Sequence, residues 1–226
     1  MQVQLEQLVV NPGQQLLLKD VSWQMYEDLI EEFGEKRGSR INYSHGLLEI
    51  MVPLPEHEDD KVIIGNFVEM LLEEYDIEFR NLASTTFKSQ NMNQGIEADQ
   101  CFYIENESLV RGKQRIDLTV DPPPDLAIEI DITSRTRFDN YRILGVRELW
   151  RFDGEKLEIN VLQDGEYIQF QESPHFPGIP IITAIPDYLN RSKIEGRNKT
   201  MKAFRAWVRE QIQFSQTSNN KPESRP

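Results

Sequence analysis

The strongest constraint on the fold is a segment in the middle of the chain, residues 122–152, which reads PPPDLAIEIDITSRTRFDNYRILGVRELWRF. After three prolines, acidic or small residues alternate with apolar ones. Neighbouring side chains of a β-strand point to opposite faces, so this alternation predicts a strand with one apolar face. The other face of that strand then carries Asp125, Ala127, Glu129 and Asp131.

The residues after this strand predict a short helix and a second strand. Thr133 or Ser134 can cap the helix, Gly145 ends it, and residues 146–152 are again typical of a strand. Strand, helix and strand form a crossover unit. Open α/β sheets place their functional sites near the carboxyl ends of such strands, where the acidic residues lie.

The acidic residues of the predicted strand need an explanation, because carboxylates two positions apart lie about 7 Å apart and repel each other. A cation, a base or water relieves this repulsion. Glu129 lies in mid-strand, where no cap explains it, so we interpret it as functional. Asp125 follows the prolines and Asp131 precedes the helix, so each is explained equally well by a strand start or a helix cap.

The composition limits the classes of partner and compartment. The chain has 226 residues, enough for one domain, and a net charge of −13, so any contact with DNA requires a local basic patch. Its single cysteine, Cys101, excludes a disulfide framework and a zinc ribbon. There is no signal-peptide pattern and no apolar run of membrane length, so we expect a cytoplasmic protein without membrane contact.

The remaining segments predict a single domain at residues 1–214 and a disordered polar tail at 215–226. Helices are predicted at 23–33, from residue 56 onward, and at 199–214; hairpins at 40–52 and 156–172; strands at 78–84, 85–89 and 101–104; loops at 91–95 and 177–186. Basic residues form a stripe on the closing helix. We interpret this stripe, Lys202, Arg205 and Arg209, as a solvated face rather than a phosphate-binding one.

Several motifs follow one another in a characteristic order. A helix begins at His57 and Glu58, a strand is introduced by Asp99, PDLAIEID contains Glu129, and a helix leads into GVRELWRFDG. In this order the motifs resemble the Uma-two family of restriction endonucleases, within the PD-(D/E)XK nuclease superfamily. The resemblance extends over residues 22–207.

The resemblance implies an α/β (α+β) fold with a restriction-endonuclease-like core. In such a core a mixed central β-sheet is flanked by helices, and the two predicted hairpins are additions to it. The resemblance also implies a Mg²⁺-dependent DNA endonuclease that hydrolyses phosphodiester bonds, with Mn²⁺ as an alternative ion. DNA is then the expected substrate, and assembly into a homodimer stays open.

By position, Asp99 matches the first acid of the superfamily signature and Glu129 the second, so the resemblance makes both of them metal ligands. Glu58, together with His57, matches the helix residue that often completes the site. A structural explanation also exists for this pair, because acidic residues at a helix start are favoured by the helix dipole. Glu97 and Asp125 are further acidic candidates.

The chain departs from the signature where a lysine is expected, because Asp131 occupies that position. The family accepts a basic residue from the following helix, where Arg135 and Arg137 are available. Arginine does not act as a general base, but it can bind a phosphate or stabilise developing charge. Asp131, a second ion or the metal alone would then activate the water.

Two other functions are compatible with the same residues. One is a non-catalytic binding or regulatory module that keeps the nuclease fold without the lysine. The other is a metal-dependent enzyme that acts on a different phosphate ester.

Overall fold

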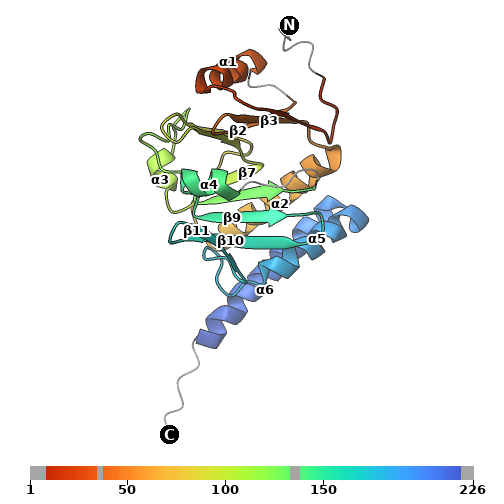
Figure 1. Ribbon diagram of the computed structural model, residues 1–226. Coiled ribbons are helices and arrows are strands. Elements are labelled where there is room, and N and C mark those ends of the chain that lie inside the picture. The colour runs from red at the N-terminus through yellow and green to blue at the C-terminus, as the bar shows by residue number, and fades with distance from the viewer. Residues whose placement is uncertain (1–8, 35–37, 133–137, 220–226) are drawn as a thin grey trace.

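The computed structural model describes residues 9–34, 38–132 and 138–219, which form two β-sheets covered by helices (Figure 1). The smaller sheet consists, in spatial order, of β1 (Gln15–Leu18), β3 (Leu47–Met51), β2 (Arg40–Ser44), β6 (Gln94–Glu97) and β5 (Thr86–Ser89). The larger sheet consists of β11 (Glu166–Phe170), β10 (Leu157–Gln163), β9 (Glu148–Phe152), β8 (Leu126–Ile130), β7 (Gln100–Tyr103) and β4 (Arg80–Asn81). The helices are α1 (Trp23–Phe33), α2 (Pro55–Glu74), α3 (Glu107–Val110), α4 (Phe138–Leu144), α5 (Ile181–Glu195) and α6 (Arg197–Asn219).

Helix α1 packs on the smaller sheet, and local signals set its limits. The Ser22 hydroxyl accepts a hydrogen bond from the Met25 N–H at 3.2 Å, and Gly34 ends the helix with a φ of 68°. The helix is held close to β6, because a Cβ added at Gly95 would lie 2.1 Å from the Tyr26 hydroxyl oxygen. The predicted helix at 23–33 is confirmed.

The hairpin of β2 and β3 is confirmed at the predicted position. It turns at His45 and Gly46, whose φ values of 45° and 86° are those of a tight two-residue hairpin turn.

The larger sheet contains the predicted crossover. Strands β8 and β9 are parallel, and α4 precedes β9 along the chain. The other strand pairs of this sheet are antiparallel, including β7 with β8, where Phe102 lies opposite Leu126. The mixed central sheet flanked by helices, which the family resemblance implies, is therefore confirmed.

Both faces of the larger sheet are covered. Leu126, Ile128 and Ile130 of β8 belong to a core formed with α2, α5 and α6, and Ala127 belongs to a second core that includes Tyr141 of α4. Burying each large apolar side chain in such a core contributes about 1.5–3 kcal/mol relative to exposing it. The predicted alternation of β8 is confirmed, and Glu129 follows Ala127 on the α4 side.

Four local predictions are wrong. The loop expected at 91–95 contains the start of β6 at Gln94. The strand expected at 78–84 shrinks to β4, because the chain turns at Ala83 with a φ of 50°. The loop expected at 177–186 contains the start of α5, and Pro186 lies inside this helix. The proline removes one helical hydrogen bond, but the buried apolar face of α5 keeps the helix intact.

The fourth difference concerns the closing helix, which was predicted to end at Phe214. Helix α6 continues to Asn219. Residues 215–219 contain neither glycine nor proline, so nothing in the sequence ends the helix at Phe214. Within the described part of the chain, the helices include none long and apolar enough to cross a membrane.

Candidate active site

Asp99 lies where the chain passes from the smaller sheet to the larger one, between β6 and β7. Its side chain is fully buried, and its Oδ2 accepts a hydrogen bond from the N–H of Ile130 at 2.7 Å. Gln100 pairs with Ile128, so the antiparallel register continued by one residue brings Asp99 opposite Glu129. The fold therefore brings together the two acids that the sequence analysis paired.

Glu129 is partly buried, and its Oε1 accepts a hydrogen bond from the Tyr141 hydroxyl of α4. Burial raises the pKa of the Glu129 carboxyl to about 8, although the positive charge of Arg40 acts in the opposite direction. The nearby charges of Asp131 and Glu49 raise this pKa further. Near neutral pH the carboxyl therefore holds a proton, and a metal ion could take the place of that proton.

Asp131 pairs with Arg151, which the sequence analysis missed. Its Oδ2 accepts hydrogen bonds from Nε and Nη2 of Arg151 at 2.7 and 2.5 Å, and both side chains are buried. The Arg151 guanidinium also lies over the Phe138 ring, 4.8 Å from its centroid. In the parallel pairing of β8 with β9, Arg151 lies opposite Glu129. Arg151 therefore supplies a positive charge beside Asp131, the position where the signature lysine is missing.

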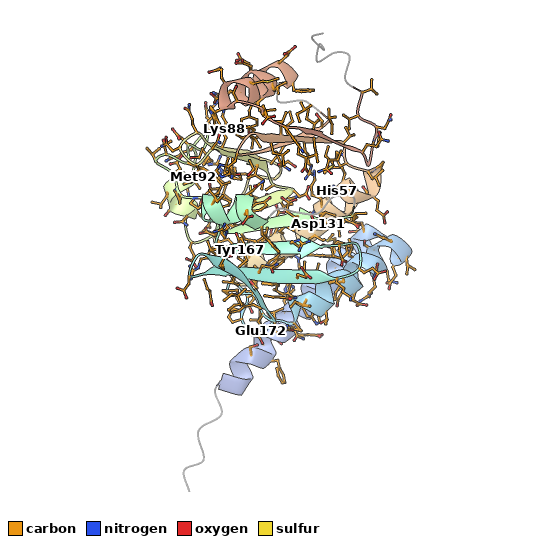
Figure 2. The ribbon with its side chains drawn as sticks, viewed as in Figure 1. His57, Lys88, Met92, Asp131, Tyr167 and Glu172 are labelled. Atoms are coloured by element: carbon orange, nitrogen blue, oxygen red, sulfur yellow. The ribbon has the colours of Figure 1, made fainter. Side chains whose placement is uncertain are left out.

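His57 and Glu58, at the start of α2, lie beside Asp99. Nε2 of the buried His57 is 3.2 Å from Oδ2 of Asp99, and its Nδ1 is 3.3 Å from Oε1 of Glu58. Hydrogen bonding from His57, with further contributions from Lys61 and Arg40, lowers the pKa of Glu58 to about 2. Figure 2 shows His57 and Asp131 at the same end of the central strands, near the carboxyl end of β9.

Arg40, at the start of β2, is a second residue that the sequence analysis missed. Its Nη1 pairs with Oδ1 of Asp99, and its Nη2 lies 3.1 Å from Oε1 of Glu58. Arg40 and His57 therefore both bridge the same two carboxylates. Contacts between residues distant in the sequence bring Arg40 here, and a charged residue at the start of the strand RINYS was its only sequence signal.

Lys61 adds another positive charge beside this network. Its ammonium group pairs with Glu58 and lies 3.3 Å from the hydroxyl of Ser84. The same hydroxyl donates a hydrogen bond to the backbone oxygen of Asp99 at 3.3 Å. Lys61 is only 12% exposed, so its charge is directed along the network rather than into solvent.

Glu97 connects strands of the smaller sheet. Its Oε2 lies 3.4 Å from the N–H of Ile41, and its own N–H donates to the Asn42 side chain at 3.0 Å. These contacts explain the residue through the pairing of β6 with β2.

Asp125 lies at the opposite end of β8 from Glu129. Its carboxylate accepts hydrogen bonds from the backbone of Ile104 and Asn106 at 2.7 and 3.0 Å, which fixes the chain after β7. The structural explanation of Asp125 is therefore the better one. The other two candidates, Arg135 and Arg137, lie outside the described residues.

The donor atoms of Asp99 and Glu129 fit a magnesium ion in type, because Mg²⁺ takes oxygen ligands, keeps several waters and uses one or two protein carboxylates. A fuller cage is not present: across residues 9–34, 38–132 and 138–219, no group of three His, Cys, Asp or Glu side chains could hold a metal. Any ion must also share or displace the contact between Asp99 and Arg40.

The basic stripe of α6 is largely used for packing against α2. Arg205 pairs with Glu73 and Glu74 at 2.7 and 2.8 Å, and Arg209 pairs with Glu74 at 2.7 Å. These contacts support the interpretation of the stripe as a charge-balancing face and not as a phosphate-binding one.

Comparison with known proteins gives three findings. The model of the Uma2 family, described as "Putative restriction endonuclease", matches residues 23–185. The crystal structure of "a putative nuclease belonging to DUF820" from Anabaena variabilis aligns with a TM-score of 0.50 and 16% sequence identity, over 66% of this chain and 90% of that one. No curated protein sequence matches the chain. The family match covers more than half of the sequence, and the structural match supports a nuclease fold.

Proposed function

The chain belongs to the Uma2 family, and on that premise we propose that it is a Mg²⁺-dependent DNA endonuclease that hydrolyses phosphodiester bonds at Asp99 and Glu129. The observation that carries the proposal is that these two acids lie opposite each other, Asp99 one residue before β7 and Glu129 in the adjacent β8, with Asp99 fixed by the Ile130 N–H. A buried carboxylate such as that of Asp99 is costly unless it has a role, and neither Asp99 nor Glu129 caps a helix.

In this proposal Asp99 and Glu129 hold the ion, and Mn²⁺ is able to replace Mg²⁺. When bound, the ion polarises the scissile phosphate and lowers the pKa of a water ligand. The Tyr141 hydroxyl orients the Glu129 carboxylate, and the Ile130 N–H orients that of Asp99.

Other residues then provide charge balance. Arg151 neutralises Asp131, so we assign Asp131 to charge balance and not to activation of the water. Replacing Asp131 by lysine would leave two cations facing each other, so it would not rebuild the signature. Arg135 and Arg137 stay proposed phosphate contacts from the segment after β8.

The test is cleavage of supercoiled and linear duplex DNA with Mg²⁺, with Mn²⁺ and with EDTA. We expect Asp99→Asn and Glu129→Gln each to lower the rate by on the order of 100-fold or more, the loss typical of removing one electrostatic contact to a transition state. Glu166→Gln, which changes an exposed carboxylate on β11, is the matched control and keeps the wild-type rate. Cleavage at the wild-type rate by either site variant contradicts the proposal.

A non-catalytic DNA-binding or regulatory module is the second candidate. The pairing of Asp99 with Arg40 favours it, because a cation already contacts the first acid. A protein that binds duplex DNA but neither binds Mn²⁺ nor cleaves would fit this candidate. A parallel panel of DNA, RNA and nucleotide substrates tests the third possibility, a different phosphate ester.

A further inference from the structure

The guanidinium of Arg40 occupies a central position among the acids of the site. Its side chain is 7% exposed, and two different nitrogens make its contacts, Nη1 to Asp99 and Nη2 to Glu58. Arginine has five N–H donors in a planar group, so it can release one partner while keeping another. A second arrangement, in which Arg40 has left Asp99 and kept Glu58, would differ from the observed one by a single ion pair.

The charges of the site favour this second arrangement when a divalent ion is bound. The positive charge of Arg40 also lowers the pKa of Glu129, more than that of Arg151 does, so Arg40 acts on both acids. A divalent ion between two ionised carboxylates gives a neutral cluster. Beside that cluster, Arg40 and Lys61 both pair with the single ionised carboxylate of Glu58, so these three residues add a net positive charge, which attracts the anionic phosphodiester.

We propose that Arg40 takes the cation position at Asp99 when no metal is bound, yields Asp99 to a divalent ion, and then binds the scissile phosphate while it stays on Glu58. This inference rests on the proposed nuclease function and names the residue that replaces the signature lysine at the phosphate. Arg40 is thus both a competitor of the metal and a contact of the substrate.

The surroundings of Arg40 hold the acids in place during this exchange. The Ile130 N–H and His57 contact Oδ2 of Asp99, whereas Arg40 contacts Oδ1. Release of Arg40 therefore opens one carboxylate oxygen to an ion without loosening the other. On the other side, Lys61 pairs with Oε2 of Glu58, and Arg40 approaches Oε1.

The experiment measures Mn²⁺ affinity by electron paramagnetic resonance and, separately, single-turnover cleavage of one DNA duplex with Mg²⁺. We expect Arg40→Gln to bind Mn²⁺ at least about tenfold more tightly, because a cation in direct contact with a ligand is removed. The same variant should cleave at least about tenfold more slowly at saturating metal, because a charge-assisted contact to the phosphate is lost. Tighter metal binding with slower cleavage is not expected of a purely structural residue.

Lys61→Gln is the matched control, because it removes the same charge from a residue that contacts Glu58 and Ser84. Because the Lys61 ammonium group contacts Glu58 and Ser84 rather than the carboxylate of Asp99, its loss should change the Mn²⁺ affinity by less than about threefold. Equal gains in the two variants, or weaker Mn²⁺ binding by Arg40→Gln, would overturn the inference. So would unchanged cleavage by Arg40→Gln.

Two further outcomes separate this inference from the proposed function. If wild type neither binds Mn²⁺ nor cleaves but Arg40→Gln binds Mn²⁺, then Arg40 does occupy the cation position and the proposed activity fails. If neither protein binds Mn²⁺, the inference fails. If circular dichroism shows that Arg40→Gln does not fold, Arg40→Lys replaces it in the experiment. One ammonium group cannot bridge both acids as the guanidinium does, so we expect Arg40→Lys to bind Mn²⁺ several-fold more tightly than wild type. An unchanged Mn²⁺ affinity of this variant refutes the inference.

Discussion

The partly buried carboxyl of Glu129 makes the stability of the metal-free protein depend on pH in an unusual direction. Its pKa rises from an ordinary 4.5 to about 8 in the folded state, mainly through burial. Because the folded pKa is the higher one, the stabilising contribution of the protonated carboxyl is complete below pH 4.5 and is lost as the pH rises through 8. At about 1.4 kcal/mol per unit, the rise corresponds to at most about 5 kcal/mol.

Substitution of Glu129 by glutamine isolates this effect. Glutamine has the same shape, and its amide oxygen can accept the hydrogen bond from Tyr141. Water near this partly buried side chain screens part of the effect, so we expect Glu129→Gln to be about 2–5 kcal/mol more stable than wild type at pH 9. At pH 5 the two proteins should differ by less than about 1 kcal/mol, because both side chains are then neutral.

The assay is urea unfolding of both proteins in EDTA at pH 5, 7 and 9, followed by circular dichroism. Glu166→Gln, on the exposed edge of β11, serves as the control and should follow wild type at every pH. A difference between Glu129→Gln and wild type that stays constant from pH 5 to pH 9 would refute the reasoning. A less stable variant at pH 9 would refute it as well.

Three other substitutions test the structure around the site by urea unfolding. Arg151→Met leaves the buried charge of Asp131 without its main partner and should cost about 3–5 kcal/mol, most of which a second change, Asp131→Asn, should recover. Glu148→Gln replaces a fully buried carboxylate, whose Oε2 lies 2.5 Å from Nδ1 of His175, and should lower the free energy of unfolding by about 1–3 kcal/mol. A decrease below about 0.5 kcal/mol would contradict that contact. Gly95→Ala places a methyl group against the tyrosine of α1 and should cost about 1–3 kcal/mol, whereas an unchanged midpoint would show that α1 packs elsewhere.

The elements that the sequence predicts well are those with local signals. Ser22 and Gly34 mark both ends of α1, and the alternation around Glu129 marks β8. The crossover into β9 follows from the same segment. These features depend on residues close together in the chain, so one sequence suffices to find them.

The network of the site depends on contacts that are distant in the sequence. Arg40 reaches Asp99 only because the smaller sheet packs beside the larger one, and no periodicity within β2 indicates this. Arg151 was overlooked because its strand, ELWRF, is otherwise typical of a buried core strand. The acids were thus predictable from their pattern, whereas the bases that neutralise them required the tertiary structure.

The ion pairs between α6 and α2 also affect how the protein would approach DNA. Arg205 and Arg209 are matched by acids of α2, so the long-range field of the molecule remains that of a chain with a net charge of −13. At low ionic strength this field repels a polyanion, and the repulsion is screened beyond about 10 Å at 0.1 M salt. Added salt therefore first strengthens association by screening that repulsion and only later weakens it by competing for the few phosphate contacts. The affinity for DNA should pass through a maximum as salt rises, whereas that of a basic DNA-binding protein falls throughout.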